Sequence, residues 1–406
     1  MFVAKGPVAR GLFIDNVAQL PLFVLRQVFV LLWLCEMARA VPRYEADFSL
    51  ALINRTGAYH VCRDIVKGLP QHFLQIRYWR FVCQSEPQGI VRKMLGRLML
   101  IEIDRRTRGA NVGSMPASGS VPTVFMDPLY VLRGGLKSSD IVLCHDVGPI
   151  THRWLFNGST VTAYERAYAM IRDVGPGMVF VSEASRLAFS QVFGEAYRFL
   201  EVIPLYVRDG VVQGHAERPV AVPDRFILTV SATEERKNFT RSIVAYARSG
   251  LAERGVGYII CGPRGNAEAE VEACARSTQG VVKLGFVSDA ELRWLYERAS
   301  GFVLPSLLEG FGVPALEAGR RGLVPLVSEG GALAEAAGAG CITVDPENIA
   351  EIADGFLRLV DMSEAERRER VLLLQGHAAK LTRTRYLECW SELLTRDAID
   401  QDRGAV

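Results

Sequence analysis

Short apolar runs alternate with amphipathic stretches along the chain from about residue 44 onward. The runs SDIVLC (139–144), MVFVS (178–182) and LEVIPL (200–205) have the length and composition of buried strands. The run DFSLALIN (47–54) predicts an earlier strand, and the amphipathic stretch 58–69 after it predicts a helix. Strands and helices that alternate in this way predict an α/β protein with parallel sheets flanked by helices.

A segment without apolar periodicity interrupts this alternation at 207–224. It is rich in Gly, Pro and charged residues, and we interpret it as a linker between two domains. A second series follows, with predicted strands at 226–232, 257–262, 281–286, 301–306 and 323–328 and predicted helices at 238–250, 288–300 and 314–322. We therefore predict two Rossmann-like, doubly wound parallel-sheet domains at 44–206 and 225–375, followed by a helical tail at 376–406. The chain from about 363 onward is expected to be mostly helical and to pack across both domains.

The N-terminal apolar segment (1–43) follows a different pattern. Residues 20–35 form a strongly apolar run that Arg26 and Gln27 interrupt. A spanning helix needs about 20 apolar residues, and an arginine in mid-span is costly. Two interpretations stay open, a helix at or in a membrane and a helix packed on the protein. A cleaved signal peptide is not expected, because no small-residue cleavage site follows.

Composition narrows the function classes. The chain has 406 residues and a formal net charge of +2, which gives no reason to expect nucleic acid as a partner. Its 8 cysteines include no CxxC pair and no zinc-ligand spacing, so we expect reduced thiols and a cytoplasmic protein. No DxD-like carboxylate cluster stands at a predicted strand end, so we expect no essential divalent metal.

The stretch LLEGFGVPALEAG (307–319) is the first candidate for chemistry. Gly310 and Gly312 allow a sharp turn after a predicted strand, and Pro314 suits the first turn of a helix. Free N–H groups at that helix start favour an anion such as phosphate. Glu309 at the mouth of the turn could accept a hydrogen bond from a sugar hydroxyl, and Glu317, one turn into the helix that follows, could accept one from a ribose hydroxyl. The alternative is an ordinary glycine turn with a solvated Glu309.

Two loops at other predicted strand ends supply further candidates. Arg236 and Lys237 in TEERKN (233–238) follow the strand 226–232 directly, where their charges suit a diphosphate. The loop CGPRGN (261–266) places Gly262 at another strand end, where the backbone can approach a nucleotide closely. A solvated basic turn and an ordinary glycine turn are the respective alternatives.

These residues resemble a family of known proteins, the family 4 glycosyltransferases of the GT-B fold. The resemblance covers roughly 226–360 and rests on TVSATEERKN, YIICGPRGN, VKLGFVSDAELRWLYERASGFVLPSLLEGFGVPALEAG and SEGGALAEAAGAGCITVDP. The N-terminal half is similar more loosely, in NRTGAYHVCRDI (54–65), CHDVGPITH (144–152) and VSEASR (181–186). The GT-B fold implies that the two Rossmann-like domains face a central cleft.

The resemblance implies a role for each candidate residue. Glu309 would hold the hydroxyls of the transferred sugar, Glu317 would hold the ribose, and Lys237 with Arg236 would neutralise the leaving diphosphate. His145 would contact the donor sugar near the reacting carbon, and Gly57 would line the cleft. The remaining donor-binding positions are Gly262, Gly310, Phe311, Gly312 and Val313. The chain departs from the family at VSATEE, which lacks the arginine that many members carry upstream of the lysine.

By the same resemblance, the protein would be a retaining hexosyltransferase without a cofactor. Its donor would be GDP-mannose or UDP-glucose, and its acceptor a lipid-linked saccharide in bacterial exopolysaccharide or lipopolysaccharide assembly. The segment 75–110 carries 8 Arg and Lys against 3 Glu and Asp among apolar residues, which suits an anionic membrane surface. A solvated basic face is the alternative. The expected location is the cytoplasm, with possible association with the inner face of the plasma membrane.

Two other functions stay open. The same fold can serve another nucleotide-sugar enzyme, such as an epimerase, or a glycan phosphorylase, although no lysine here stands out as a site for pyridoxal phosphate. A non-catalytic scaffold that binds a nucleotide sugar is a further alternative. Loss of the glutamate pair or of the basic pair would favour that scaffold, and both pairs are present.

Overall fold

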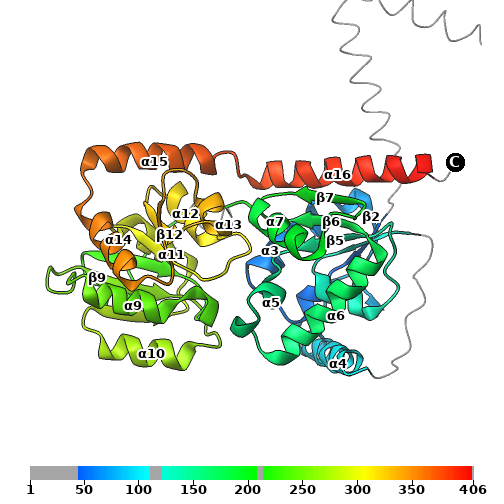
Figure 1. Cartoon of the computed structure of the whole chain (residues 1–406), viewed down its shortest axis with the longest axis horizontal. Coiled ribbons are helices and arrows are strands. Elements are labelled where there is room, and N and C mark those ends of the chain that lie inside the picture. The colour runs from blue at the N-terminus through cyan, green and yellow to red at the C-terminus, as the bar shows by residue number, and fades with distance from the viewer. Residues whose placement is uncertain (1–43, 110–120, 208–213, 405–406) are drawn as a thin grey trace, which may run out of the picture.

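The computed structural model describes residues 44–109, 121–207 and 214–404, which form two α/β lobes side by side (Figure 1). The predicted N-terminal segment 1–43 and part of the predicted linker, 208–213, lie outside the described residues. Each lobe is built around one sheet with helices on its faces, as the alternation of apolar runs and amphipathic stretches predicts.

The first sheet has seven strands in the order β3-β2-β1-β4-β5-β6-β7. All neighbouring strands are parallel except the pair β2 and β3, which is antiparallel. The strands are β1 (Tyr44–Asp47), β2 (Phe73–Tyr78), β3 (Phe81–Val82), β4 (Thr123–Phe125), β5 (Ile141–Cys144), β6 (Gly177–Phe180) and β7 (Phe199–Val202). Since parallel strands end at the same edge of the sheet, the loops after β1, β4, β5 and β6 lie at one edge.

The second sheet has six parallel strands in the order β10-β9-β8-β11-β12-β13. They are β8 (Phe226–Val230), β9 (Gly257–Cys261), β10 (Val281–Gly285), β11 (Phe302–Leu304), β12 (Pro325–Ser328) and β13 (Ile342–Val344). The chain order reverses between β8 and β11, so the loops after these two strands flank the topological switch point, where ligands of such sheets bind.

The helices cover both sheets. Those of the first lobe are α3 (Gly57–Gly68), α4 (Gly89–Thr107), α5 (Gly148–Thr151), α6 (Gly158–Val174) and α7 (Glu183–Phe193). Those of the second are α9 (Phe239–Arg248), α10 (Glu268–Ser277), α11 (Asp289–Arg298), α12 (Val313–Arg320), α13 (Gly331–Ala337), α14 (Ile349–Asp361) and α15 (Glu364–Ala378). Among the described residues, none of the helices is long and apolar enough to cross a membrane.

The last helix, α16 (Arg383–Gly404), returns from the second lobe to the first (Figure 1). Its side chains Tyr386, Trp390, Leu393 and Leu394 belong to the apolar core that lies under the first sheet. The hydroxyl of Tyr44 on β1 donates to Asp397 Oδ2 at 2.6 Å. The predicted tail is thus helical, and its helix α16 packs on the first lobe.

The first strand lies earlier than the apolar run 47–54 predicts. That run contains the end of β1 and then a 3-10 helix, η2 (Ser49–Leu52), whose residues are all buried. The strand itself alternates apolar residues with Glu45 and Asp47, and these carboxylates are also buried. The prediction was wrong because two charged residues hide a fully buried strand from a pattern that scores only apolar positions.

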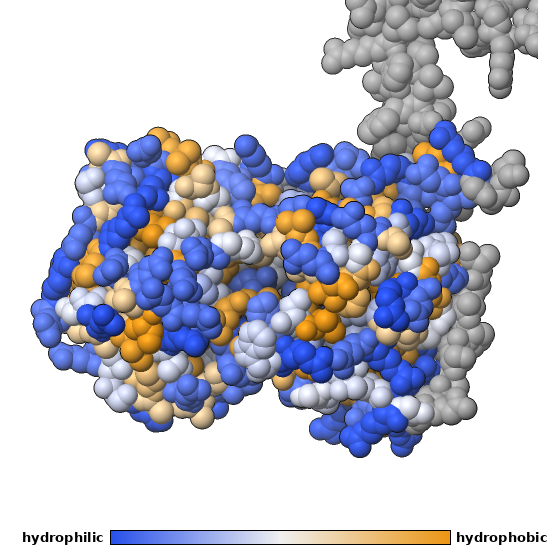
Figure 2. All heavy atoms as spheres, in the orientation of Figure 1, coloured by the Kyte–Doolittle hydropathy of each residue, from blue (hydrophilic) through white to orange (hydrophobic). Residues whose placement is uncertain are grey.

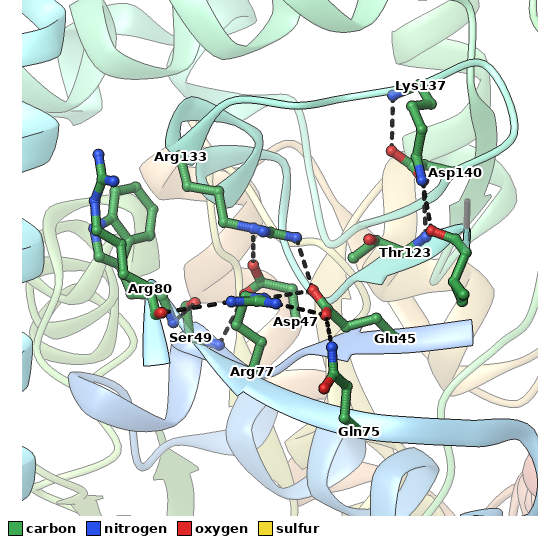
Figure 3. A network of polar contacts seen from close by, with 12 residues as sticks. Glu45, Asp47, Ser49, Gln75, Arg77, Arg80, Thr123, Arg133, Lys137 and Asp140 are labelled. Atoms are coloured by element: carbon green, nitrogen blue, oxygen red, sulfur yellow. Dashed lines mark hydrogen bonds and ion pairs between the residues drawn. The ribbon is translucent and has the colours of Figure 1, made fainter. Parts of the chain in front are cut away.

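Buried arginines neutralise these two carboxylates (Figure 3). Arg77 on β2 donates to Glu45 through Nε at 2.5 Å and through Nη2 at 2.8 Å. Arg133, at the end of the 3-10 helix η4 (Pro128–Arg133), pairs with Asp47 at 2.6 Å and with Glu45 at 3.3 Å. Burial alone would raise the pKa of Glu45, but Arg77 and Arg133 lower it, so the charged form is retained inside the lobe.

Candidate active site

The glycine turn after β11 lies where the two lobes meet. Gly312 has φ of 108°, a conformation that favours glycine, and α12 begins directly after it. A Cβ atom on Gly310 would lie 2.2 Å from the carbonyl oxygen of His145 in the first lobe. Likewise, a Cβ atom on Gly148 in the first lobe would lie 2.3 Å from Leu308 Cδ2 in the second. The turn therefore requires glycine at 310 because the backbone of the other lobe packs against it.

Glu309 in this turn pairs with both basic residues that the sequence singled out. Its Oε1 lies 2.5 Å from Lys237 Nζ, and its Oε2 lies 3.4 Å from Arg236 Nη1. The side chains of Glu309 and Lys237 are each only 8% exposed, and Ser306 donates to Glu309 at 3.1 Å. Three predicted site residues from two separate loops are thus brought together at the carboxyl ends of β8 and β11.

The loop that carries the basic pair is fixed from several sides. Arg236 and Lys237 form a short 3-10 helix, η6 (Glu235–Lys237), which ends at Asn238 in the left-handed conformation with φ of 62°. The amide of Asn238 donates to the carbonyls of Pro305 at 2.9 Å and Pro346 at 2.7 Å. Asparagine suits this position because it tolerates positive φ and supplies two N–H donors to buried carbonyls.

Burial and charge act in opposite directions on the ion pair. Burial alone would raise the pKa of Glu309, but Lys237 and Arg236 lower it below the usual value. Burial lowers the pKa of Lys237, and the charge of Glu309 opposes that effect. Arg236 also pairs with Glu234, through Nε at 2.6 Å, so the two cations of this site face two carboxylates.

His145 follows β5 in the first lobe, and its backbone is the segment that faces the glycine turn. Its ring Nε2 lies 3.1 Å from the carbonyl oxygen of Met126 and 3.7 Å from Cys62 Sγ. A carbonyl accepts only, so Nε2 is the donor in that contact. The next residue, Asp146, accepts from the backbone N–H of Gly148 at 2.8 Å and shapes the turn into α5.

Glu317, Phe311 and Val313 lie on the second-lobe side of the same turn. The carboxylate of Glu317 is buried, and the hydroxyl of Tyr296 on α11 donates to it at 3.2 Å. Phe311 is also buried and belongs, with Val313 at its margin, to the apolar core of the first lobe. A contact of Phe311 with a ligand would therefore have to come from its main chain.

Gly262 and Gly57 lie apart from the ion pair. Gly262, after β9, has φ of 145°, and a Cβ atom there would lie 2.0 Å from the carbonyl oxygen of Ser231. This glycine allows its loop to pack against the end of β8. Gly57 is the exposed first residue of α3, and its role as a cleft residue stays a prediction.

A cavity of about 710 Å³ opens beside the Gly262 loop. Its lining comes from the ends of β9 and β10 and from one face of α10, and it includes Gly262, Arg264, Lys283 and the exposed Phe286. Neither Glu309 nor Lys237 lines it. Among the residues that the structure describes, no group of three or more His, Cys, Asp or Glu side chains is arranged to hold a metal ion.

Sequence reasoning missed the contacts that join the two lobes. The Ser182 side chain caps α7 by accepting from the backbone N–H of Ser185. Both hydroxyls also donate to the carbonyl of Gly310 in the other lobe. A pattern along one chain cannot reveal such a contact, because the two partners are separated by more than a hundred residues.

The chain is similar in sequence to known glycosyltransferases. Residues 215–371 match the family model of the glycosyl transferases group 1. The chain is 26% identical over 234 residues to the serotype-specific mannosyltransferase WbdA of Escherichia coli, covering 52% of this chain and 28% of that protein. It is 32% identical over 137 residues to the O-antigen chain mannosyltransferase B of Escherichia coli, covering 33% of this chain and 36% of that protein. The chain thus spans about a third or less of the length of these relatives.

Solved structures extend the likeness to both lobes. A trehalose-6-phosphate synthase superimposes with a TM-score of 0.62 at 14% identity, over 87% of this chain and 99% of that chain. A UDP-forming α,α-trehalose-phosphate synthase from Burkholderia vietnamiensis gives 0.58 at 15% identity, over 77% and 79%. The predicted GT-B fold is confirmed. Through its second lobe, the chain is similar to the glycosyl transferases of group 1.

Proposed function

We propose that the protein is a retaining hexosyltransferase that moves a mannosyl group from GDP-mannose to a lipid-linked saccharide. The observation that carries this proposal is the cluster of Arg236, Lys237 and Glu309, which lies at strand ends of the second lobe beside the backbone of His145. The relatives described as mannosyltransferases favour mannose as the sugar, and the O-antigen relative favours polysaccharide assembly.

The basic pair would stabilise the leaving diphosphate. As the bond between the anomeric carbon and the phosphate oxygen breaks, negative charge grows on the diphosphate, and cations fixed in a desolvated site lower the energy of that state. Lys237 is buried and the Arg236 side chain is only 22% exposed, so less solvent has to reorganise around them than around surface cations. We propose that these two residues need no divalent metal beside them.

Glu309 would change partner when the donor binds. Its carboxylate now pairs with Lys237 and Arg236, and a bound diphosphate would replace it as their partner. The freed carboxylate, which directly precedes Gly310, can then accept a hydrogen bond from a hydroxyl of the transferred sugar. His145, held through Nε2 by the carbonyl of Met126, would contact the same sugar from the first lobe.

An exposed surface of the first lobe supports an acceptor that is held in a membrane. Apolar side chains on α4 are exposed beside Lys93, Arg97 and Arg105, a combination that suits an anionic bilayer and thus an acceptor held in it. We propose that the enzyme works at the inner face of the plasma membrane. The acceptor's sugar and the linkage formed are left to experiment.

The test is a panel of nucleotide sugars, GDP-mannose and UDP-glucose included, with lipid-linked acceptors from the bacterial membrane. Released nucleoside diphosphate and labelled product are measured with and without EDTA, and the anomeric configuration of the product is determined by NMR. We expect GDP-mannose turnover that EDTA does not abolish and that retains configuration. If no donor is turned over while calorimetry still detects nucleotide binding, the non-catalytic scaffold is favoured. If no donor is turned over and no nucleotide binds, the proposal fails.

Variants of the ion pair assign the roles. Glu309→Gln and Lys237→Ala should each lower turnover at least about tenfold, a modest loss for an electrostatic contact to a transition state. Arg254→Ala is the matched control, because Arg254 forms an exposed ion pair with Asp361 in the same lobe. Wild-type turnover in both ion-pair variants would remove these residues from the mechanism.

A further inference from the structure

The start of α7 is joined to the second lobe by two sets of hydrogen bonds. Ser182 Oγ lies 2.7 Å and Ser185 Oγ 3.2 Å from the carbonyl oxygen of Gly310, the residue after Glu309. The carboxylate of Glu335 on α13 accepts from the backbone N–H groups of Glu183 at 2.8 Å and Ala184 at 3.1 Å. Figure 1 shows α7 and α13 facing each other where the lobes meet.

The two serines place their hydroxyls at this boundary. Ser182 Oγ accepts from the backbone N–H of Ser185, and two acceptors lie within reach of its proton, the carbonyl oxygen of Gly310 at 2.7 Å and Ser185 Oγ at 2.9 Å. Ser185 Oγ lies between two carbonyl oxygens, those of Gly310 at 3.2 Å and His145 at 3.3 Å. Both hydroxyls are buried, so water cannot replace the carbonyl of Gly310 as their partner while the lobes are together.

Glu335 caps a helix that belongs to the other lobe. The first N–H groups of a helix have no partner within it, and a carboxylate there is also favoured by the helix dipole. Ser182 satisfies one of these groups from within the first lobe, and Glu335 satisfies two more from the second. The cap of α7 is therefore complete only while the lobes are together.

We propose that Ser182, Ser185 and Glu335 form an interdomain clamp that positions the Glu309 turn for sugar transfer. The clamp holds the carbonyl of Gly310, and this fixes the backbone that carries Glu309 relative to His145. Opening releases the turn and admits the donor, and closing rebuilds the site around it. This inference rests on the proposed transfer for its kinetic part, while its structural part stands on the lobe contacts alone.

The kinetic test compares Ser182→Ala and Ser185→Ala with Ser182→Thr. A positioning role predicts that each alanine variant lowers kcat about tenfold or more while the donor KM changes less than about threefold, because a misplaced group costs rate more than binding. Ser182→Thr keeps the hydroxyl and should recover most of the rate. Ser363→Ala is the matched control, since Ser363 caps α15 in the same way without touching the other lobe. Equal kcat in Ser182→Ala and wild type would overturn the positioning role.

The structural test needs no turnover. Small-angle scattering should give a larger radius of gyration for Ser182→Ala/Glu335→Ala than for wild type or Ser363→Ala, and amide exchange at Glu183 and Ala184 should be faster in Glu335→Ala. An unchanged radius together with unchanged exchange would overturn the clamp. If wild type transfers no sugar from any donor, the proposed function fails, and the scattering and exchange results still decide whether the clamp exists.

Discussion

Arg133 supplies a positive charge that two buried carboxylates of β1 share. It lies 2.6 Å from Asp47 and 3.3 Å from Glu45, and its side chain is only 3% exposed. Replacing it with methionine keeps most of the volume but leaves Asp47 buried without its cation. Removal of one partner from a buried ion pair destabilises strongly, so we expect Arg133→Met to lower the free energy of unfolding by about 3 kcal/mol, measured by urea denaturation.

The control for Arg133 is an exposed ion pair in the same lobe. Arg153 pairs with Glu165, and both side chains are largely open to solvent, at 56% and 41% exposure. Such pairs contribute less than about 1 kcal/mol, so Arg153→Met should unfold close to wild type. Equal losses in the two variants would mean that burial does not govern these pairs.

Single residues also show what a sequence can and cannot reveal about the site. The glycine turn and the basic dipeptide are local patterns with a chemical meaning, and the structure does bring Glu309 within 2.5 Å of Lys237. The contact of Ser182 with Gly310 depends on how two lobes meet, which no local pattern encodes. The roles of Glu317, Gly262 and Gly57 toward a ligand stay predictions.

At the level of elements, α4 is tied to the β2–β3 turn through one carboxylate. Burial alone would raise the pKa of Glu102, but hydrogen bonds from Arg80, Trp79 and Arg106 lower it to about 2. A carboxyl whose pKa is lower in the folded state stabilises above its unfolded pKa, near 4.5, and loses that contribution as the pH falls toward 2.

The comparison of wild type with Glu102→Gln isolates this effect. At pH 7 we expect the variant to be about 2–3 kcal/mol less stable, from the size of the shift. By pH 3 the difference should fall by more than half, because Glu102 then becomes protonated more readily in the unfolded chain than in the folded one. Urea unfolding at both pH values measures it, and a difference independent of pH would exclude the ion pairs as its source.

The outer face of α4 carries the membrane prediction. Ile90, Met94, Leu98 and Ile101 fall on one side of the helix and are 84%, 53%, 51% and 51% exposed. We expect binding to vesicles that contain phosphatidylglycerol, weakened by salt, and at least about tenfold weaker binding for Ile90→Ser/Met94→Ser/Ile101→Ser, because apolar area and charge act together. Flotation assays measure both effects.

Two controls accompany the flotation assay. Val220 is 89% exposed elsewhere, so Val220→Ser should bind as wild type does, and vesicles of neutral lipid should bind weakly. Undiminished binding of the triple variant would assign the membrane contact to another part of the chain. The sequence alone does not show which face of α4 is exposed, because the buried residues Leu95, Met99 and Ile103 make the helix apolar on a second side.

At the scale of the whole molecule, the sequence predicts the architecture better than the packing of its last part. Alternating apolar runs predict two doubly wound sheets, since each run must be buried between helices, and both sheets are present. Figure 2 shows polar and apolar residues mixed over the visible surface of both lobes. The position of α16 depends on the shape of the first lobe and on polar contacts with it, which include those of Tyr44, Arg198 and Asp64.

This placement of α16 predicts that the end of the chain stabilises its beginning. Trp390 is fully buried in the core of the first lobe, so Trp390→Ala should lower the free energy of unfolding by about 3–5 kcal/mol. The loss should fall on the first lobe, because the residues that surround Trp390 belong to it. Amide exchange should therefore quicken in β1, β4 and β5 while β8, β9 and β11 keep their protection. Leu372→Ala on α15, where Leu372 is 71% exposed, should change neither sheet. Faster exchange of β8 and β9 in Trp390→Ala would instead mean that the two lobes unfold as one unit.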